Sequence, residues 1–157
     1  MASNQGVIGK KKFLYGIDIG GSYTKLGKFD KDLKLLDMNQ IKSDNSSPIK
    51  LVSNIIDFIE QSGVKQEEII GYGLGSLGVV KDNTIVKSVN LGIEDFDIKS
   101  MFTQITGNQY VVVTNDCNTA TYGEYIYRNF SVPKSVVMIT LGTGMGAGYI
   151  INGKIME

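Results

Sequence analysis

Alternating apolar positions mark the beginning of the chain as extended structure. Residues 13–19, FLYGIDI, place apolar side chains on one side of a strand, and residues 24–29 return as a second strand after a Gly-Gly turn. A third strand is predicted over residues 33–41, after the DKD turn. The apolar positions that share one side of the first strand are Phe13, Tyr15, Ile17 and Ile19. The sequence therefore predicts three consecutive strands.

Two later segments have apolar residues at the spacing of amphipathic helices. The first, SSPIKLVSNIIDFIEQSG, has Ser47 as N-cap, Pro48 at the first helical position and Gly63 as terminator. The second begins after Asp97, which caps it, and ends at Gly107. The apolar positions are Leu51, Val52, Ile55, Ile56 and Ile59 in the first helix and Ile98, Met101, Phe102 and Ile105 in the second.

The remaining apolar runs complete a mixed α/β pattern. IIGYGLGSLGVV is typical of a buried strand that leaves into a glycine-rich loop, and KDNTIV after it predicts a hairpin. YVVV is typical of a strand covered on both faces, and TNDCNTATYGEYIY indicates a strand-to-helix junction. The order β-β-β-α-β-α-β-α predicts a mixed α/β sheet rather than the plain alternation of a dinucleotide-binding fold.

Composition and charge narrow the class of protein. With 157 residues, 42% of them hydrophobic, the chain can bury the core of one domain or slightly more. Sixteen basic and sixteen acidic residues balance, so neither a nucleic-acid partner nor an anionic membrane is indicated. A single cysteine, Cys117, and the lack of a membrane-spanning apolar run predict a cytoplasmic protein. Residues 1–12, with their KKK run, are expected to be a disordered tail.

The sequence contains no histidine. It therefore provides no His-based triad, no His metal ligand and no His general base, and a zinc site made by this chain alone is not expected. A Walker A sequence is absent as well, because GKF and GKI lack both the hydroxyl residue after Lys and the upstream glycine. Any general acid or base in this chain is a carboxylate.

Asp18 interrupts the first apolar strand just before a glycine turn. A carboxylate there needs compensation, and the turn offers the backbone N–H groups of Gly20 and Gly21 and the hydroxyls of Ser22 and Thr24. That set suits a phosphate and its metal, with Asp18 facing Mg²⁺ through water. An ordinary hairpin with a Gly-Gly turn explains the same residues, and the segment alone leaves both readings open.

Two other glycine-rich segments stand out. Residues 73–78, GLGSLG, fit the G-x-G-x-x-G pattern, but no helix follows at once, so a loop beside a small ligand or a plain glycine turn remains. MITLGTGMGAGYIING repeats the strand, glycine-hydroxyl turn and strand of GIDIGGSYTKLG, with Gly142 in the place of Gly20. Either the similarity is chance, or two phosphate loops are present and the second opens another domain of similar plan.

Taken in order, these motifs resemble those of the ROK sugar kinases, within the actin-like ATPase and hexokinase group of ribonuclease H-like folds. DIGGSYTKLG resembles the first phosphate motif, GLGSLG the sugar-side loop, and VNLGIEDFDIKSMF the segment leading to the second helix. VTNDCNTATYGE resembles the catalytic Asn-Asp stretch and TLGTGMGAGYIINGKI the second phosphate motif. Ser22 stands where Thr is commoner and Leu77 where Pro is usual. The resemblance extends over almost the whole chain from residue 13.

The resemblance implies ATP-dependent phosphorylation of a hexose or N-acetylhexosamine hydroxyl. Asp116 would accept the proton of the attacking hydroxyl, although by sequence alone it also reads as a helix N-cap. The implied sugar contacts are Asn115, Asn90, Gly75 and Ser76. The implied contacts to the ATP phosphates and Mg²⁺ are Asp18, Gly20, Gly21, Ser22, Thr24, Gly142, Thr143, Gly144 and Gly146, with Asp18 on the metal side through water.

The same resemblance divides the chain into residues 13–133, a sugar- and phosphate-binding domain, and residues 134–157, the start of an ATP-binding domain. Family members are longer, and their zinc-binding segment, sugar-contacting Glu and adenine pocket follow the second phosphate motif. The chain is therefore expected to be an N-terminal portion without kinase activity of its own, and the whole enzyme is expected to be a homodimer. Structural zinc is expected only in the later half.

Two rival functions come from other classes. Some members of the family are sugar-sensing repressors with an N-terminal helix-turn-helix, for which the dozen residues before the first strand are too few. Another actin-like ATPase is the second rival, and the Asn115-Asp116 pair argues against it.

Overall fold

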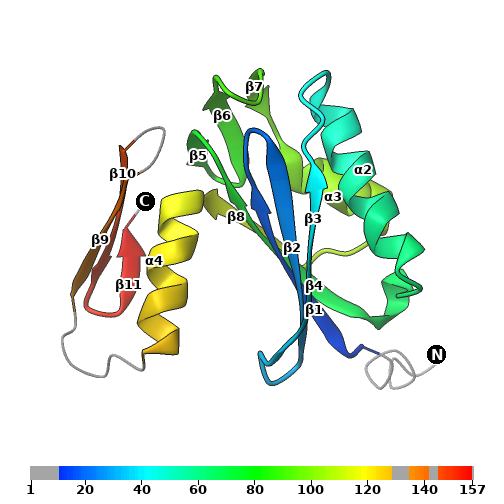
Figure 1. Ribbon diagram of the computed structural model, residues 1–157, viewed down its shortest axis with the longest axis horizontal. Helices are drawn as coiled ribbons and strands as arrows, with labels where there is room; N and C mark the ends of the chain where they lie inside the picture. Colours follow the sequence, from blue (N-terminus) through cyan, green and yellow to red (C-terminus); the bar gives the residue numbers. More distant parts are fainter. Residues whose placement is uncertain (1–10, 129–134, 142–144, 157) are drawn as a thin grey trace, which may run out of the picture.

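The largest sheet has five strands. The computed structural model describes residues 11–128, 135–141 and 145–156. In the order β3-β2-β1-β4-β8, β1 to β3 pair antiparallel, and β4 pairs parallel with both β1 and β8 (Figure 1). The bounds are β1 Phe13–Ile19, β2 Tyr23–Asp30, β3 Leu35–Lys42, β4 Ile69–Ser76 and β8 Val111–Asn115. The predicted mixed α/β sheet is confirmed.

Helices cover both faces of this sheet. α2, Pro48–Gln61, and α3, Ile98–Thr106, lie on one face, and α4, Asp116–Tyr127, lies on the other (Figure 1). A short 3-10 helix, η1, Gln66–Glu68, leads into β4. Because α4 starts where β8 ends, its first residues lie at the carboxyl edge of the parallel strands.

The main core lies between the sheet and the layer of α2 and α3. Ile17 and Ile19 of β1 are buried there with Ile55 of α2 and Phe102 of α3. Side chains alternate along a strand, so Asp18, between the two isoleucines, points to the opposite face, on which α4 lies. Asp18 is therefore not a core residue, and its side chain keeps 53% of its exposure.

The ends of α2 and α3 follow the predicted signals. Pro48 is the first residue of α2, and Gly63 follows its C-cap with a φ of 83°. Asp97 caps α3 by accepting the N–H of Ser100 at 2.9 Å, and Gly107 ends it with a φ of 70°. Glycine adopts such positive φ values more readily than any other residue, which explains both terminators.

A small second sheet extends from the carboxyl end of β4. It contains β5 Val79–Lys81, β6 Thr84–Ser88 and β7 Ile93–Phe96. Asp82 and Asn83 join β5 to β6 with φ values of 50° and 64°, which is the turn geometry of the predicted hairpin. The strand β7 was not predicted, because IEDF is only four residues long and half acidic.

A third sheet packs on the side of α4 that faces away from the five-stranded sheet (Figure 1). Its strands are β9 Val136–Leu141, β10 Met145–Ile151 and β11 Lys154–Met156. Two strands were expected here, and the third forms because Asn152-Gly153 makes a hairpin turn with φ values of 51° and 75°. Helix α4 is thus enclosed between two sheets.

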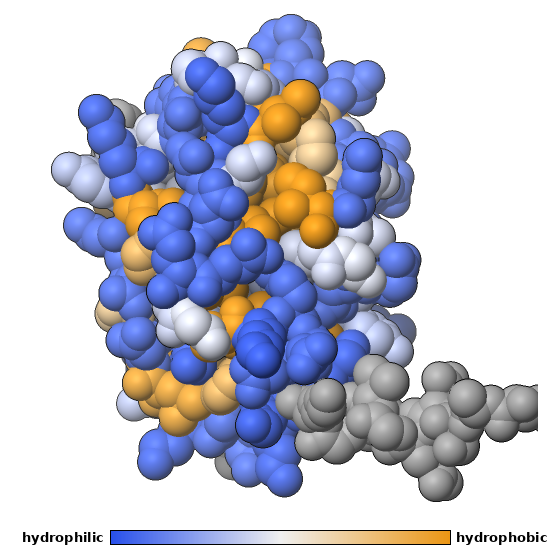
Figure 2. Space-filling view, turned by 90° about the vertical axis from the view of Figure 1, so that its right-hand side faces the viewer, coloured by the Kyte–Doolittle hydropathy of each residue, from blue (hydrophilic) through white to orange (hydrophobic). Residues whose placement is uncertain are grey.

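The opposite side of the molecule, where α2 lies, is a solvated face. Figure 2 shows hydrophilic side chains over most of it, with apolar side chains in separate patches.

Near the start of the described chain, the backbone N–H of Lys12 donates to the carbonyl of Glu68 at 2.7 Å. Among the residues described, no helix is both long and apolar enough to cross a membrane.

Candidate functional site

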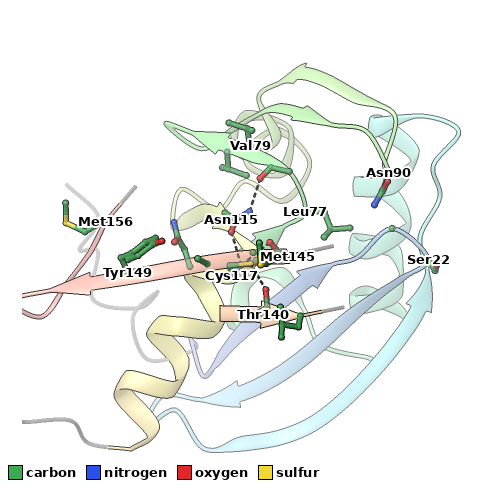
Figure 3. Close-up of a pocket in the computed structure, with 18 residues that line it drawn as sticks. Ser22, Leu77, Val79, Asn90, Asn115, Cys117, Thr140, Met145, Tyr149 and Met156 are labelled. Atoms are coloured by element: carbon green, nitrogen blue, oxygen red, sulfur yellow. Dashed lines mark hydrogen bonds between the residues drawn. The ribbon is translucent and has the colours of Figure 1, made fainter. Parts of the chain in front are cut away.

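A cavity of about 1200 Å³ opens at the carboxyl ends of β4 and β8. It is lined from the glycine turn after β1, from β5, from the first turn of α4 and from β9 and β10 (Figure 3). The side chains of Ser22, Asn90, Asn115, Asp116 and Thr140 lie along it. Open α/β sheets commonly bind ligands at this edge, where loops from several strands converge.

Asn115 caps helix α4. Its Oδ1 accepts the backbone N–H of Cys117 at 2.9 Å, and its Nδ2 donates to the carbonyl of Gly78 at 2.8 Å (Figure 3). The sequence left Asp116 open as the cap, but Asp116 is the first helical residue, and its Oδ1 shares the same N–H at 3.0 Å. The cap therefore does not depend on the Asp116 carboxylate, which is half-buried and lines the cavity.

Asp116 also lines a second, smaller cavity of about 320 Å³, together with Asp18. Partial burial raises the pKa of the Asp18 carboxyl above its ordinary value; the Lys25 ammonium, 3.8 Å away, lowers this pKa, and the charge of Asp116 raises it again. Two carboxylates of like charge thus face one space from β1 and from α4. An arrangement of this kind favours a cation or a proton between them.

The donor chemistry here fits a magnesium ion that keeps most of its water shell. Asp18 and Asp116 supply carboxylate oxygens, which are the ligands that Mg²⁺ prefers. In the described part of the chain, no group of three or more carboxylate or thiol side chains could enclose a metal ion. A site of this composition suits a metal that arrives with a phosphate ligand rather than one held by the protein alone.

The turn after β1 brings Gly21 and Ser22 to the large cavity. Gly20 does not line it, and its N–H donates to the carbonyl of Tyr23 at 3.1 Å. Thr24, expected as a phosphate contact, is fully buried, and its hydroxyl is 2.9 Å from that of Ser43. Thr24 belongs to the interior because it shares its side of β2 with buried Leu26.

The sugar-side loop is only partly brought to the cavity. Asn90 lines it, as do Leu77 and Gly78. Ser76 is completely buried, with its hydroxyl 3.3 Å from the carbonyl of Leu77, and Gly75 lies under α4, where a Cβ would be 2.7 Å from Oγ1 of Thr119. Gly75 and Ser76 therefore shape the strand end, and the residues after them face the open space.

The second glycine loop is described in part. Gly142, Thr143 and Gly144 lie outside the described residues. Gly146 lines the large cavity from β10, next to the Cys117 thiol, where a Cβ would be 2.2 Å from the sulfur. Glycine is thus required at this position by close packing, whatever ligand the cavity holds.

Sequence reasoning missed several residues of this region, among them Thr140, Ser43 and Asn45. Thr140 of β9 lines both cavities, and its hydroxyl lies 3.2 Å from the Cys117 sulfur (Figure 3). Ser43 and Asn45, after β3, bond to the glycine turn. The SDNSS run that contains the last two is a polar cluster, but no local pattern indicates which loop it contacts.

The chain is similar to proteins named as glucokinases and as a xylose repressor. The model of the ROK family matches residues 14–157. A glucokinase of Halalkalibacterium halodurans is 32% identical over 93% of this chain and 46% of its own length. The xylose repressor of Bacillus subtilis is 28% identical over 93% of this chain and 39% of its own length.

A solved structure gives the same relationship in three dimensions. The ROK family glucokinase of Streptomyces griseus, in complex with glucose and AMPPNP, superposes with a TM-score of 0.79 at 29% identity, over 92% of this chain and 46% of that one. The chain thus spans about half the length of the relatives that it matches. The chain has the actin-like ATPase fold of these kinases.

Proposed function

The chain belongs to the ROK family, and from this premise we propose that the protein is an ATP-dependent sugar kinase that phosphorylates a hydroxyl of a hexose or N-acetylhexosamine. One observation carries the proposal. The Asp116 carboxylate lies at the start of α4 without being needed as its cap, in a cavity shared with the glycine turn and adjoining Asp18.

Asp116 is the proposed general base. A hydroxyl of the sugar attacks the γ-phosphorus of ATP, the bond from that phosphorus to the bridging β,γ-oxygen breaks, and ADP leaves with the electron pair. The hydroxyl proton passes to the carboxylate of Asp116. A carboxylate is basic enough, because the transition state is loose and its nucleophile stays nearly neutral until late. Asn115 and Asn90 line the same cavity and would orient neighbouring hydroxyls.

Phosphate binding is proposed for the two glycine turns. Gly21 and Ser22 line the cavity and offer backbone N–H groups, with Gly20 shaping the turn. From the other side Gly146 lines it, and Gly142, Thr143 and Gly144 are proposed to complete the second turn. Asp18 would hold Mg²⁺ through water, and that ion supplies charge neutralisation of the phosphates.

A sugar-responsive regulator is the second candidate. The xylose repressor matches nearly the same portion of the chain as the glucokinase does, so the likeness alone does not separate the two functions. Both would bind sugar, but only the kinase would release ADP.

The test is a coupled ADP-release assay with a panel of hexoses and N-acetylhexosamines, on a protein that carries this chain at the length of its relatives. We expect ADP release that depends on one or a few of these sugars and on Mg²⁺. Calorimetric sugar binding without any ADP release would reject the kinase and support the regulator. Absence of both binding and turnover across the panel would reject both functions.

A further inference from the structure

Residues 43–45, which follow β3, hold the glycine turn from its outer side. Oγ of Ser43 donates to the carbonyl of Gly20 at 2.6 Å, and the backbone N–H of Ser43 donates to the carbonyl of Ser22 at 3.0 Å. Nδ2 of Asn45 donates to the carbonyl of Gly21 at 2.7 Å. Three successive carbonyl groups of the turn are thus directed toward one short segment.

This arrangement fixes the direction of the N–H groups in the turn. In a trans peptide the C=O of one residue and the N–H of the next point in opposite directions. The N–H groups of Gly21 and Ser22 therefore point away from residues 43–45. Gly21 and Ser22 line the large cavity, whereas Ser43 and Asn45 do not. The hydrogen bonds from residues 43–45 thus direct the N–H groups of the glycine turn toward the large cavity.

Asn45 also reaches the loop that carries Asn90. Its Nδ2 lies 3.3 Å from the carbonyl oxygen of Asn90, so one amide group contacts two loops. The two loops also lie close together, because a Cβ on Gly21 would be 3.3 Å from Cβ of Asn90. Asn45 is therefore placed to hold the separation between the phosphate turn and the sugar-side loop.

We infer that Asn45 is a positioning residue, which clamps the glycine turn to the Asn90 loop and keeps the N–H groups of the turn directed at the cavity. The inference rests on the proposed function for the identity of the ligands, since phosphate and sugar would meet between these two loops. The hydrogen bonds themselves are made within the chain, so the clamp can be measured without turnover.

Two substitutions separate the hydrogen-bond donor from the mere presence of the side chain. Asn45→Asp keeps the size and shape of the side chain but removes the N–H donors and places a carboxylate against two carbonyl oxygens. Asn45→Ala removes the side chain. Asn54→Ala is the matched control, because Asn54 is an exposed asparagine on α2 that donates a long hydrogen bond of 3.4 Å to Asp44 rather than to the glycine turn or the Asn90 loop.

The experiment is hydrogen–deuterium exchange on the full chain, resolved to residues 20–23 and 90–92. Because a lost hydrogen bond of this kind corresponds to roughly a 2- to 12-fold change in an equilibrium, we expect both segments to exchange several-fold faster in Asn45→Asp and in Asn45→Ala. Asn54→Ala should exchange like wild type. Exchange of both segments at the wild-type rate in Asn45→Asp overturns the inference, and so does faster exchange confined to residues 20–23.

The exchange result and the proposed function can fail separately. If no sugar is phosphorylated while both segments loosen in Asn45→Asp, the kinase assignment is wrong and the clamp is real. If the kinase is active, a second readout applies: Asn45→Asp should raise the KM for ATP and for sugar several-fold with the fold intact. An unchanged KM for both substrates contradicts the positioning role.

Discussion

The side-chain oxygen of Asn115 accepts the backbone N–H of Cys117 at 2.9 Å, and this contact makes Asn115 the cap of α4. The amide nitrogen of the same side chain donates to the carbonyl of Gly78. Asn115 thus fixes both the start of the helix and the loop after β4. Because the capping task falls to Asn115, the neighbouring carboxylate of Asp116 is available for a ligand.

We predict that Asn115→Ala lowers the free energy of unfolding by about 1 kcal/mol, the usual value of a lost N-cap. Asn115→Asp should lose clearly less, because an aspartate accepts the Cys117 N–H as well as asparagine does. The loop bond to Gly78 is lost in both variants, and a carboxylate beside that carbonyl adds a cost to Asn115→Asp alone, so the measured difference is a lower limit for the cap. Urea denaturation at pH 7 measures the difference, and equal losses for Ala and Asp would contradict this prediction.

The comparison of Asn115 with Asp116 shows what the sequence could and could not predict. The helix start was predicted within one residue, because capping signals are local. Which of two adjacent polar residues caps the helix depends on the backbone path from β8 into α4, and that path is not a local property of the sequence. The contact of Asn45 with Gly21 joins residues 24 apart, so no periodicity reveals it.

Burial of Thr24, in contrast, had a signal in the sequence. Thr24 and Leu26 are two positions apart in β2, and that spacing places both side chains on the same side of the strand. The glycine turn before Thr24 also fits a phosphate-binding threonine, so the motif and the alternation indicated different roles. Full burial and the hydrogen bond to Ser43 show that Thr24 is an interior residue.

Asp18→Asn should stabilise the fold at neutral pH. Partial burial raises the pKa of the Asp18 carboxyl in the folded chain, so ionisation of this group disfavours folding as the pH rises through that pKa. The amide removes this cost, and the exposed ion pair with Lys25 that is lost contributes little. Since the site is half exposed, we expect a rise in Tm on the order of 1 °C at pH 7.

The pH dependence of the Tm difference between Asp18→Asn and wild type tests this explanation. Below the unfolded pKa both forms of residue 18 are neutral, so the difference in Tm between Asp18→Asn and wild type should vanish near pH 3. Asp57→Asn, an exposed site on α2, is the control variant. A variant at position 18 that melts lower than wild type at pH 7 contradicts the prediction.

A glycine that packs against α4 and a glycine within α4 should respond oppositely to substitution by alanine. A Cβ on Gly148 would be 2.1 Å from Oγ1 of Thr121 and 2.8 Å from the carbonyl of Cys117, so β10 would have to move away from α4. We expect Gly148→Ala to cost about 1–3 kcal/mol. Gly123 lies within α4 with nothing within 4 Å of its Cβ position, and Gly123→Ala should stabilise by about 0.5–1 kcal/mol. Urea midpoints that move in the same direction would refute this account.

The outer face of the third sheet should make this chain self-associate. Val137 and Ile139 of β9 and Ile151 of β10 are 60%, 62% and 47% exposed, while the other face of β10 packs on α4. An apolar sheet face with β9 as an open edge favours pairing between copies. Light scattering should show oligomers that grow with concentration, and Ile139→Lys should suppress them. Ile105→Lys, on α3, is the control, and a monodisperse wild-type monomer at high concentration would contradict the prediction.

Asp116→Asn, in a protein that carries this chain at the length of its relatives, tests the proposed base directly. The amide is nearly isosteric with the carboxylate, and Asn115 keeps the cap, so the fold and most of the sugar affinity should be retained. An amide cannot take the proton of the sugar hydroxyl, and loss of such a group lowers kcat by roughly 10²- to 10⁴-fold.

Asp97→Asn is the matched control, since Asp97 caps the start of α3 and its substitution should leave kcat unchanged. Coupled ADP-release kinetics and a thermal melt of each variant separate the two roles. If Asp116→Asn melts normally and turns over sugar within about threefold of wild type, far less than the loss of a general base, Asp116 is not the catalytic base.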